Sequence, residues 1–140
     1  MANQVAQHTR RMAAYMALAG GALVLLFWAL YFSGAIAPGG DDPSVKGFET
    51  AFPFADTILG VVLIAAAVGL LRGRAFGSFL LVVGASMALY LGVLDVTFYA
   101  HQGTYARLTI SNAAELLINA ACVSGGAAGL YIGWRMWQCY

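Results

Sequence analysis

The feature that most constrains the fold is a set of four long apolar segments in a chain of 140 residues. A helix crosses the hydrocarbon core of a bilayer with roughly 20 predominantly apolar residues, and each segment is close to that length. Hydrophobic residues make up 61% of the chain and charged residues 9%, which leaves too little polar surface to cover a water-soluble globule. We therefore predict an all-α integral membrane protein, a single antiparallel four-helix bundle over residues 1–140. The expected helices span approximately residues 13–37, 54–71, 78–100 and 113–137.

Basic residues gather at one set of helix ends. Two of the seven lysines and arginines, Lys46 and Arg107, lie on the opposite side. Because Lys and Arg are enriched in cytoplasmic loops, we predict that both termini are cytoplasmic and that the protein resides in a bacterial-type plasma membrane. The net charge of +1 is too small to indicate a nucleic-acid partner. The five residues at the cytoplasmic ends are Arg10, Arg11, Arg72, Arg74 and Arg135.

The connections and helix ends carry further local signals. Residues 38–47 are rich in Gly, Pro and Asp, which predicts an exposed, turn-rich loop. Aromatic side chains near the helix ends, among them Trp28, Tyr31 and Phe32, are expected to anchor the bundle at headgroup depth. The first apolar segment is longer than the ~7–15-residue core of a signal peptide, so we expect it to be retained.

All six acidic residues lie toward the other set of helix ends, and three of them lie within the apolar segments. A carboxylate in hydrocarbon costs on the order of 2.5–3.5 kcal/mol, so Asp56, Asp95 and Glu115 require an explanation. Asp56 follows Pro53 in the first turn of a helix, where the helix dipole favours an anion. Glu115 stands three residues after Asn112, which is the spacing of a capping box. Both residues therefore have a structural explanation beside a functional one.

Asp95 has neither of these explanations. It lies roughly 7 Å inside its span by helical rise, near the negative end of the helix dipole. Another group must compensate its charge. The sequence offers Arg107, His101 as imidazolium, a tyrosine hydroxyl such as Tyr99 or Tyr105, or a proton on Asp95 itself. A purely structural pair of Asp95 with Arg107 is the alternative to a functional role.

One face of the fourth predicted helix carries Asn112, Glu115, Asn119, Cys122 and Gly126 at helical spacing. A polar stripe about two turns deep in a membrane must face protein or water. We therefore predict that the outer halves of the second, third and fourth helices enclose a polar recess that binds a ligand. Carboxylates that share a poorly hydrated space cannot all ionise cheaply, so at least one should have a raised pKa. The predicted ligand-binding residues are Asp56, Asp95, His101, Arg107, Asn112, Glu115 and Asn119.

Small residues recur every four positions in three of the four helices. Such stripes allow close approach of helix backbones in lipid. We expect the stripe of Gly125, Gly129 and Gly133 to face another chain, either in a homo-oligomer or in a complex with partner membrane subunits. Packing inside the bundle is the alternative. The other stripes are Gly84, Ala88 and Gly92, and Ala65, Gly69 and Gly73.

Motifs with a specific chemistry are absent from the sequence. It contains no C-x-x-C, G-x-S-x-G, H-E-x-x-H, Walker or Rossmann pattern, so no catalytic residue is predicted and no cofactor is indicated. Carboxylates with one histidine suit a hard cation, but no pair has the close spacing of Glu-x-x-His on one helix, so no metal site is predicted. The predicted architecture resembles that of small tetraspan families such as DoxX-like proteins and the sterol-isomerase and sigma-2 group.

The sequence therefore favours a tetraspan membrane protein, in contact with membrane lipids, that binds a small lipid-like or cationic ligand in an acidic outer-leaflet recess. Asp95 would be the counter-charge or proton acceptor. The first alternative is a structural accessory subunit of a larger membrane complex, docked through glycine-rich helix faces. Further alternatives are an enzyme that uses the carboxylates as general acid and base and a proton-coupled transporter.

Overall fold

The computed structural model describes residues 2–36, 43–106 and 110–138, without the side chains of residues 2–6, 110–112 and 114. All regular secondary structure in these ranges is helical, as predicted, and four of the helices are long and apolar enough to cross a membrane. The elements are α1 (Ala2–Phe32), α2 (Pro43–Glu49), α3 (Pro53–Leu71), α4 (Ala75–His101), a 3₁₀ turn (Thr104–Ala106) and α5 (Ile110–Trp137).

Glycines in the left-handed conformation end three of the helices. Gly34, Gly73 and Gly103 have φ of 77°, 66° and 66° and follow α1, α3 and α4. At the end of α1, the Gly34 N–H donates to the Tyr31 carbonyl and the Ala35 N–H donates to the Leu30 carbonyl, which is the Schellman arrangement. The predicted end of the first helix at residue 37 was therefore wrong, because apolar residues continue beyond the glycine that ends the helix.

The first connection contains a helix that the sequence reading missed. Residues 38–47 were predicted to be a turn-rich loop, but α2 begins at Pro43 and runs to Glu49. Proline is well suited to the first helical position, since its missing N–H would have no intrahelical partner there. Residues 37–42 lie outside the described ranges, so the loop prediction for them stays a prediction.

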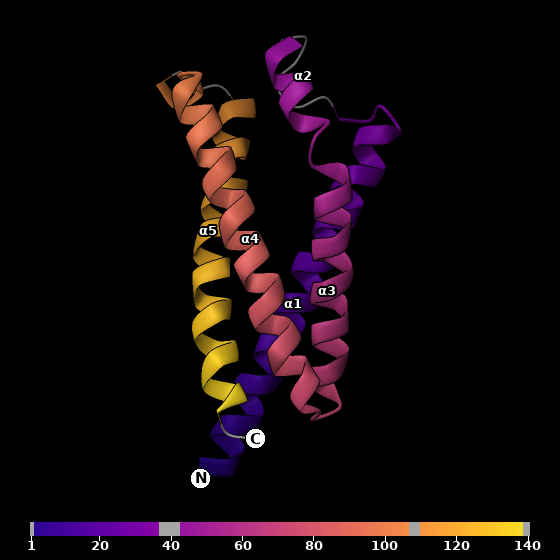
Figure 1. Ribbon diagram of the computed structural model, residues 1–140, viewed down its shortest axis with the longest axis vertical. Helices are drawn as coiled ribbons and strands as arrows, with labels where there is room; N and C mark the ends of the chain where they lie inside the picture. Colours follow the sequence, from indigo (N-terminus) through magenta and orange to yellow (C-terminus); the bar gives the residue numbers. More distant parts are fainter. Residues whose placement is uncertain (1, 37–42, 107–109, 139–140) are drawn as a thin grey trace.

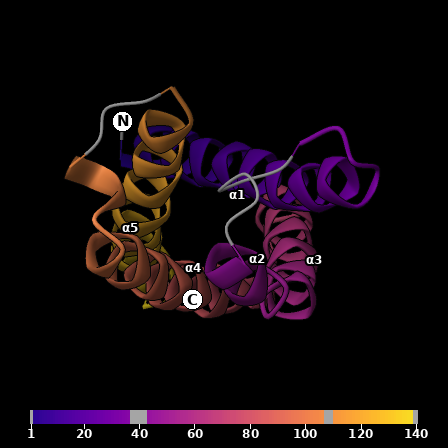
Figure 2. The same ribbon diagram turned by 90° about the horizontal axis from the view of Figure 1, so that it is seen from above.

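The four long helices pack in the order of the chain. Helix α1 packs on α3, α3 on α4, and α4 on α5, whereas α1 and α5 make few contacts. Successive long helices run in opposite directions, and the two chain ends lie at the same end of the molecule (Figure 1). Seen from above, α1 begins beside α5 and slants away from it (Figure 2). The axes of α1 and α5 therefore diverge toward the end that carries α2.

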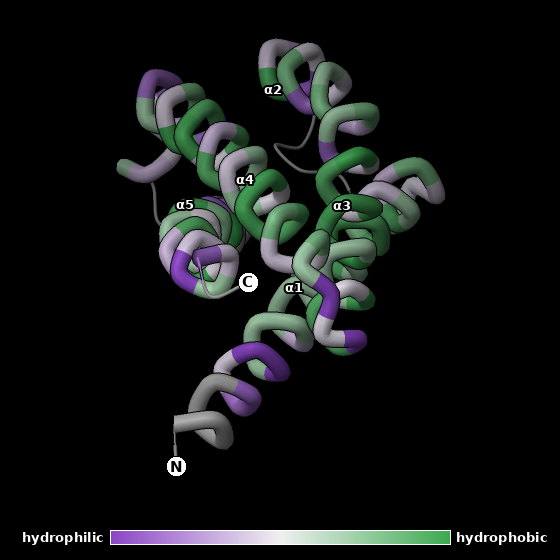
Figure 3. The backbone as a smooth tube through the Cα atoms, turned by 60° about the horizontal axis from the view of Figure 1, so that its bottom comes forward, coloured by the Kyte–Doolittle hydropathy of each residue, from purple (hydrophilic) through white to green (hydrophobic). Residues whose placement is uncertain are grey.

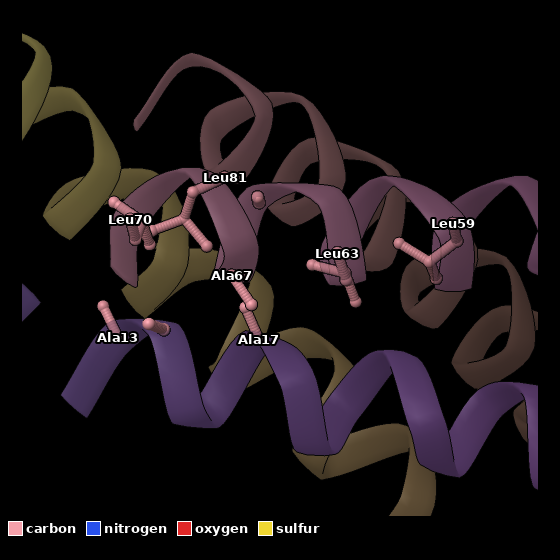
Figure 4. Close-up of a cluster of buried hydrophobic side chains, with 9 residues drawn as sticks. Ala13, Ala17, Leu59, Leu63, Ala67, Leu70 and Leu81 are labelled. Atoms are coloured by element: carbon pink, nitrogen blue, oxygen red, sulfur yellow. The ribbon is translucent and has the colours of Figure 1, made fainter. Parts of the chain in front are cut away.

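The packed core lies nearer the end with the chain termini. It joins α1, α3 and α4 (Figure 4), and its buried residues are Ala13, Ala14, Ala17, Leu59, Leu63, Ala66, Ala67, Leu70 and Leu81. Most other apolar side chains of the long helices are exposed, and the hydrophilic residues gather mainly near the helix ends (Figure 3). This distribution suits an integral membrane protein, whose apolar surface faces lipid.

Neighbouring helices approach each other closely at glycines, where no Cβ separates the two backbones. A Cβ on Gly69 of α3 would lie 2.6 Å from the Gly77 Cα of α4, and one on Gly21 of α1 would lie 2.7 Å from the Gly60 carbonyl of α3. In α5, Gly129 and Gly133 pack against α4. Gly125 has open space around it. Of the stripe expected to face another chain, two glycines are therefore occupied by packing inside this chain.

Candidate functional site

A cavity of about 610 Å³ lies among the four long helices. Most of its wall is aliphatic, and from Leu81 to Asp95 the α4 wall extends over roughly 21 Å of helix axis at ~1.5 Å per residue. Several lining residues of α1 and α5 are also exposed at the molecular surface, including Leu23, Leu26 and Ile118. Because α1 and α5 scarcely touch, the cavity has a side that faces the surroundings of the bundle.

Four carboxylates from four elements line one end of this cavity. They are Glu49 at the end of α2, Asp56 in the first turn of α3, Asp95 late in α4 and Glu115 early in α5. In Figure 1, α2, the start of α3, the end of α4 and the start of α5 all lie toward the end opposite the chain termini. Asp95 lies close enough to the other three to experience their charges. No Lys, Arg or His is among the described residues that line the cavity.

A buried tryptophan holds Asp56. The Trp28 indole N–H donates to the Asp56 carboxylate at 2.8 Å, which ties α1 to α3. Trp28 is only 4% exposed, so its prediction as a headgroup anchor was wrong. A buried indole N–H requires an acceptor, and the first turn of α3 supplies one. Tyr31 and Phe32 make edge and tilted contacts with the Trp28 ring.

A buried tyrosine holds Glu49. The Tyr99 hydroxyl of α4 donates to the Glu49 carboxylate, and beside this pair the Phe48 and Phe98 rings stack at 3.7 Å. Burial raises the pKa of Glu49, the nearby Asp56 raises it further, and the Tyr99 hydrogen bond partly opposes both effects. The side chains of α2 therefore bridge to α4 and bring a fourth carboxylate into the cavity.

Asp95 and Glu115 differ from the first two carboxylates, because neither accepts a hydrogen bond from the described residues. Tyr99, one group expected to compensate Asp95, donates to Glu49 instead. Next to them, Asn119 is 1% exposed and donates its amide N–H to the Tyr105 hydroxyl at 2.9 Å. The Asn119 amide oxygen accepts no hydrogen bond from the described residues.

The cavity thus gathers four of the seven predicted ligand-binding residues: Asp56, Asp95, Glu115 and Asn119. Cys122 and Gly126, which continue the polar stripe of α5, also line it. His101 ends α4 with an exposed side chain and does not line the cavity.

The other two predicted residues cannot be placed. Arg107 lies outside the described residues, as does the side chain of Asn112, so their roles stay predictions. Because α5 begins at Ile110, Asn112 lies inside the helix and not at its N-cap, so the capping-box explanation of Glu115 was wrong.

Sequence reasoning missed two residues of this site, Glu49 and Trp28. Both lie outside the segments of the predicted recess, and both reach it through packing between distant elements. The sequence signal for Glu49 was indirect. Pro43 is well suited to the first position of a helix, and the short helix that begins there ends at Glu49. Among the described residues, no three His, Cys, Asp or Glu side chains are placed to hold one metal ion.

Comparison of this chain with protein-family models, with curated proteins and with solved structures found no match.

Proposed function

We propose that this protein is an antiparallel four-helix membrane protein, with both termini cytoplasmic, that binds a lipid-like cation in the cavity between α1 and α5. The cationic head would lie among the four carboxylates, and the apolar tail would lie along the aliphatic walls. The observation that carries the proposal is the asymmetry of the cavity, which is acidic at one end and aliphatic along the rest of its length.

The charges at the acidic end favour a cation over other heads. Ionised groups removed from water require a partner of opposite charge, and the described lining supplies acids and no bases. An anionic head such as a phosphate or sulfate would meet like charges and be rejected.

The aliphatic walls favour an amphiphile over a small hydrophilic cation. Burial of apolar surface supplies affinity only when the ligand has apolar surface to bury. The exposed residues on the α1 and α5 walls, among them Leu23 and Ile118, would let a ligand dissolved in the bilayer enter sideways.

The proposal is tested with a dodecylammonium probe that carries a nitroxide on its chain. In protein with Trp134 and Trp137 both replaced by phenylalanine, Trp28 is the remaining tryptophan and lines the cavity. In phosphatidylcholine nanodiscs, the probe should quench Trp28 fluorescence saturably, and Asp95→Asn should weaken this binding. Thr97→Val is the matched control, because Thr97 lies exposed on the same helix and outside the cavity lining. Equal probe affinity in Asp95→Asn and in the parent would contradict the proposal.

A second candidate function is a structural accessory subunit of a larger membrane complex. Gly125 favours it, because this glycine is exposed and has open space where a partner helix could approach. In that case the purified chain would be monomeric, yet other membrane subunits would copurify with it from its host. A Gly125→Leu variant should then lose those subunits.

A further inference from the structure

The hydrogen-bonding groups at the acidic end of the cavity differ in whether they already have a partner within the protein. The side-chain donors at the acidic end are the Trp28 indole, the Tyr99 hydroxyl and the Asn119 amide, and each donates within the protein. Their respective acceptors are the Asp56 carboxylate, the Glu49 carboxylate and the Tyr105 hydroxyl. The acceptors that remain toward the cavity outnumber the remaining donor, which is the second N–H of the Asn119 amide.

Those remaining acceptors come from α4 and α5. The Asp95 and Glu115 carboxylates accept no hydrogen bond from the described residues. Asn119 also lines the cavity and is 1% exposed, and because its hydrogen bond to Tyr105 uses the amide nitrogen, the amide oxygen is a further acceptor. Carboxylate and amide oxygens accept hydrogen bonds, so this set of groups suits a ligand that donates them.

We propose that this end of the cavity selects a primary ammonium over a quaternary ammonium of the same charge, with Asp95, Glu115 and Asn119 as its acceptors. This inference rests on the proposed function. A primary ammonium carries three donors, which match the two carboxylates and the amide oxygen. A quaternary ammonium has no donor and could form no hydrogen bond with these acceptors.

Aromatic faces offer the competing mode of recognition. Quaternary ammonium groups are held in cages of several aromatic rings. The described lining of this cavity contains Phe27 and Trp28 as its aromatic residues, both on α1, and the Trp28 N–H is already bonded to Asp56. An aromatic cage built from several sides is therefore not present among the described lining residues.

The test compares four nitroxide-labelled dodecyl amphiphiles that differ only in their head: primary ammonium, trimethylammonium, maltoside and sulfate. Each is titrated in nanodiscs against the protein in which Trp28 is the remaining tryptophan. The primary ammonium should bind about tenfold more tightly than trimethylammonium, which corresponds to ~1.4 kcal/mol. Equal affinity of the two cations would overturn the selection and leave the proposed function standing. Absence of saturable quenching by either cation, or tighter binding of maltoside or sulfate, would overturn both.

Asn119 is tested by the ratio of the two cation affinities. Asn119→Leu should weaken the primary ammonium and leave trimethylammonium nearly unchanged, since only the first uses the amide oxygen. A merely structural role would weaken both cations alike. The comparison of heads on the parent protein decides the proposal even if Asn119→Leu does not fold.

Discussion

At the residue scale, the four carboxylates of the cavity divide into two kinds. Asp56 and Glu49 are each held by a buried aromatic donor, Trp28 and Tyr99, that also ties one helix to another. Asp95 and Glu115 have no such donor among the described residues. The held pair therefore contributes to the shape of the cavity, while the other pair is the one that we propose contacts the ligand.

Trp28→Phe should destabilise the protein, because it keeps an aromatic ring but removes the hydrogen bond to Asp56. We expect a loss of about 1–2 kcal/mol in the free energy of unfolding, within the range for hydrogen bonds to charged groups and in membrane helices. Titration of micelles with sodium dodecyl sulfate measures this free energy. Trp134→Phe is the control, since Trp134 is 56% exposed. A loss no larger than that of the control would show that the hydrogen bond contributes little.

The Glu49 carboxyl should make stability depend on pH. Burial raises its pKa above the ordinary value of 4.5, so the folded protein holds this proton more tightly than the unfolded chain does. The unfolding free energy should therefore fall as pH rises from the ordinary glutamate pKa through the raised one. Glu49→Gln keeps an acceptor for Tyr99 and removes the charge, so its unfolding free energy should fall less over that range. Identical pH profiles for the two proteins would refute this effect.

At the element scale, glycines decide where helices end and how closely they approach. The left-handed conformation of Gly34, Gly73 and Gly103 is a local property of glycine, so the helix ends at these residues can be predicted from the sequence. The predicted end of the first helix was wrong because the apolar run was given more weight than Gly34. The short helix α2 was missed because its identity depends on contacts with α4, such as the Phe48 and Phe98 stack. A seven-residue helix has too few internal hydrogen bonds to be specified by its own sequence.

Gly69→Ala should loosen the contact between α3 and α4. The added Cβ would lie 2.6 Å from the Gly77 Cα, which is backbone, so the helices must separate. Overpacking of this kind costs about 1–3 kcal/mol. Gly125→Ala is the matched control, because its Cβ would meet open space and should be neutral or stabilising by up to ~1 kcal/mol. Unfolding titrations in detergent compare the two, and equal stability would contradict the close contact.

At the scale of the whole molecule, the charge distribution and the position of the cavity predict one orientation. Five of the seven basic residues belong to α1, the turn between α3 and α4, and the last turn of α5, whereas the cavity carboxylates belong to α2, the start of α3, the end of α4 and the start of α5. These two sets of segments lie at opposite ends of the molecule (Figure 1). From the positive-inside rule we predict that the basic end lies in the cytoplasm and the acidic end of the cavity in the outer leaflet.

Cysteine labelling tests this orientation. With both native cysteines replaced by serine, Gly47→Cys should react with a membrane-impermeant maleimide applied to intact cells. Gln138→Cys should react only after the membrane is opened. Both positions are exposed in the structure, so access depends on the side of the membrane. The reverse labelling pattern would overturn the orientation.

The sequence by itself determined the four apolar helices, because span length, hydropathy and charge are local properties of each segment. It also singled out Asp56, Asp95, Glu115 and Asn119, since polar groups in apolar helices require partners. Only the tertiary structure decided that α1 slants away from α5, and that Trp28 and Glu49 complete the acidic end. These contacts join residues far apart in the chain, and close packing at glycines sets them, so no single segment encodes them.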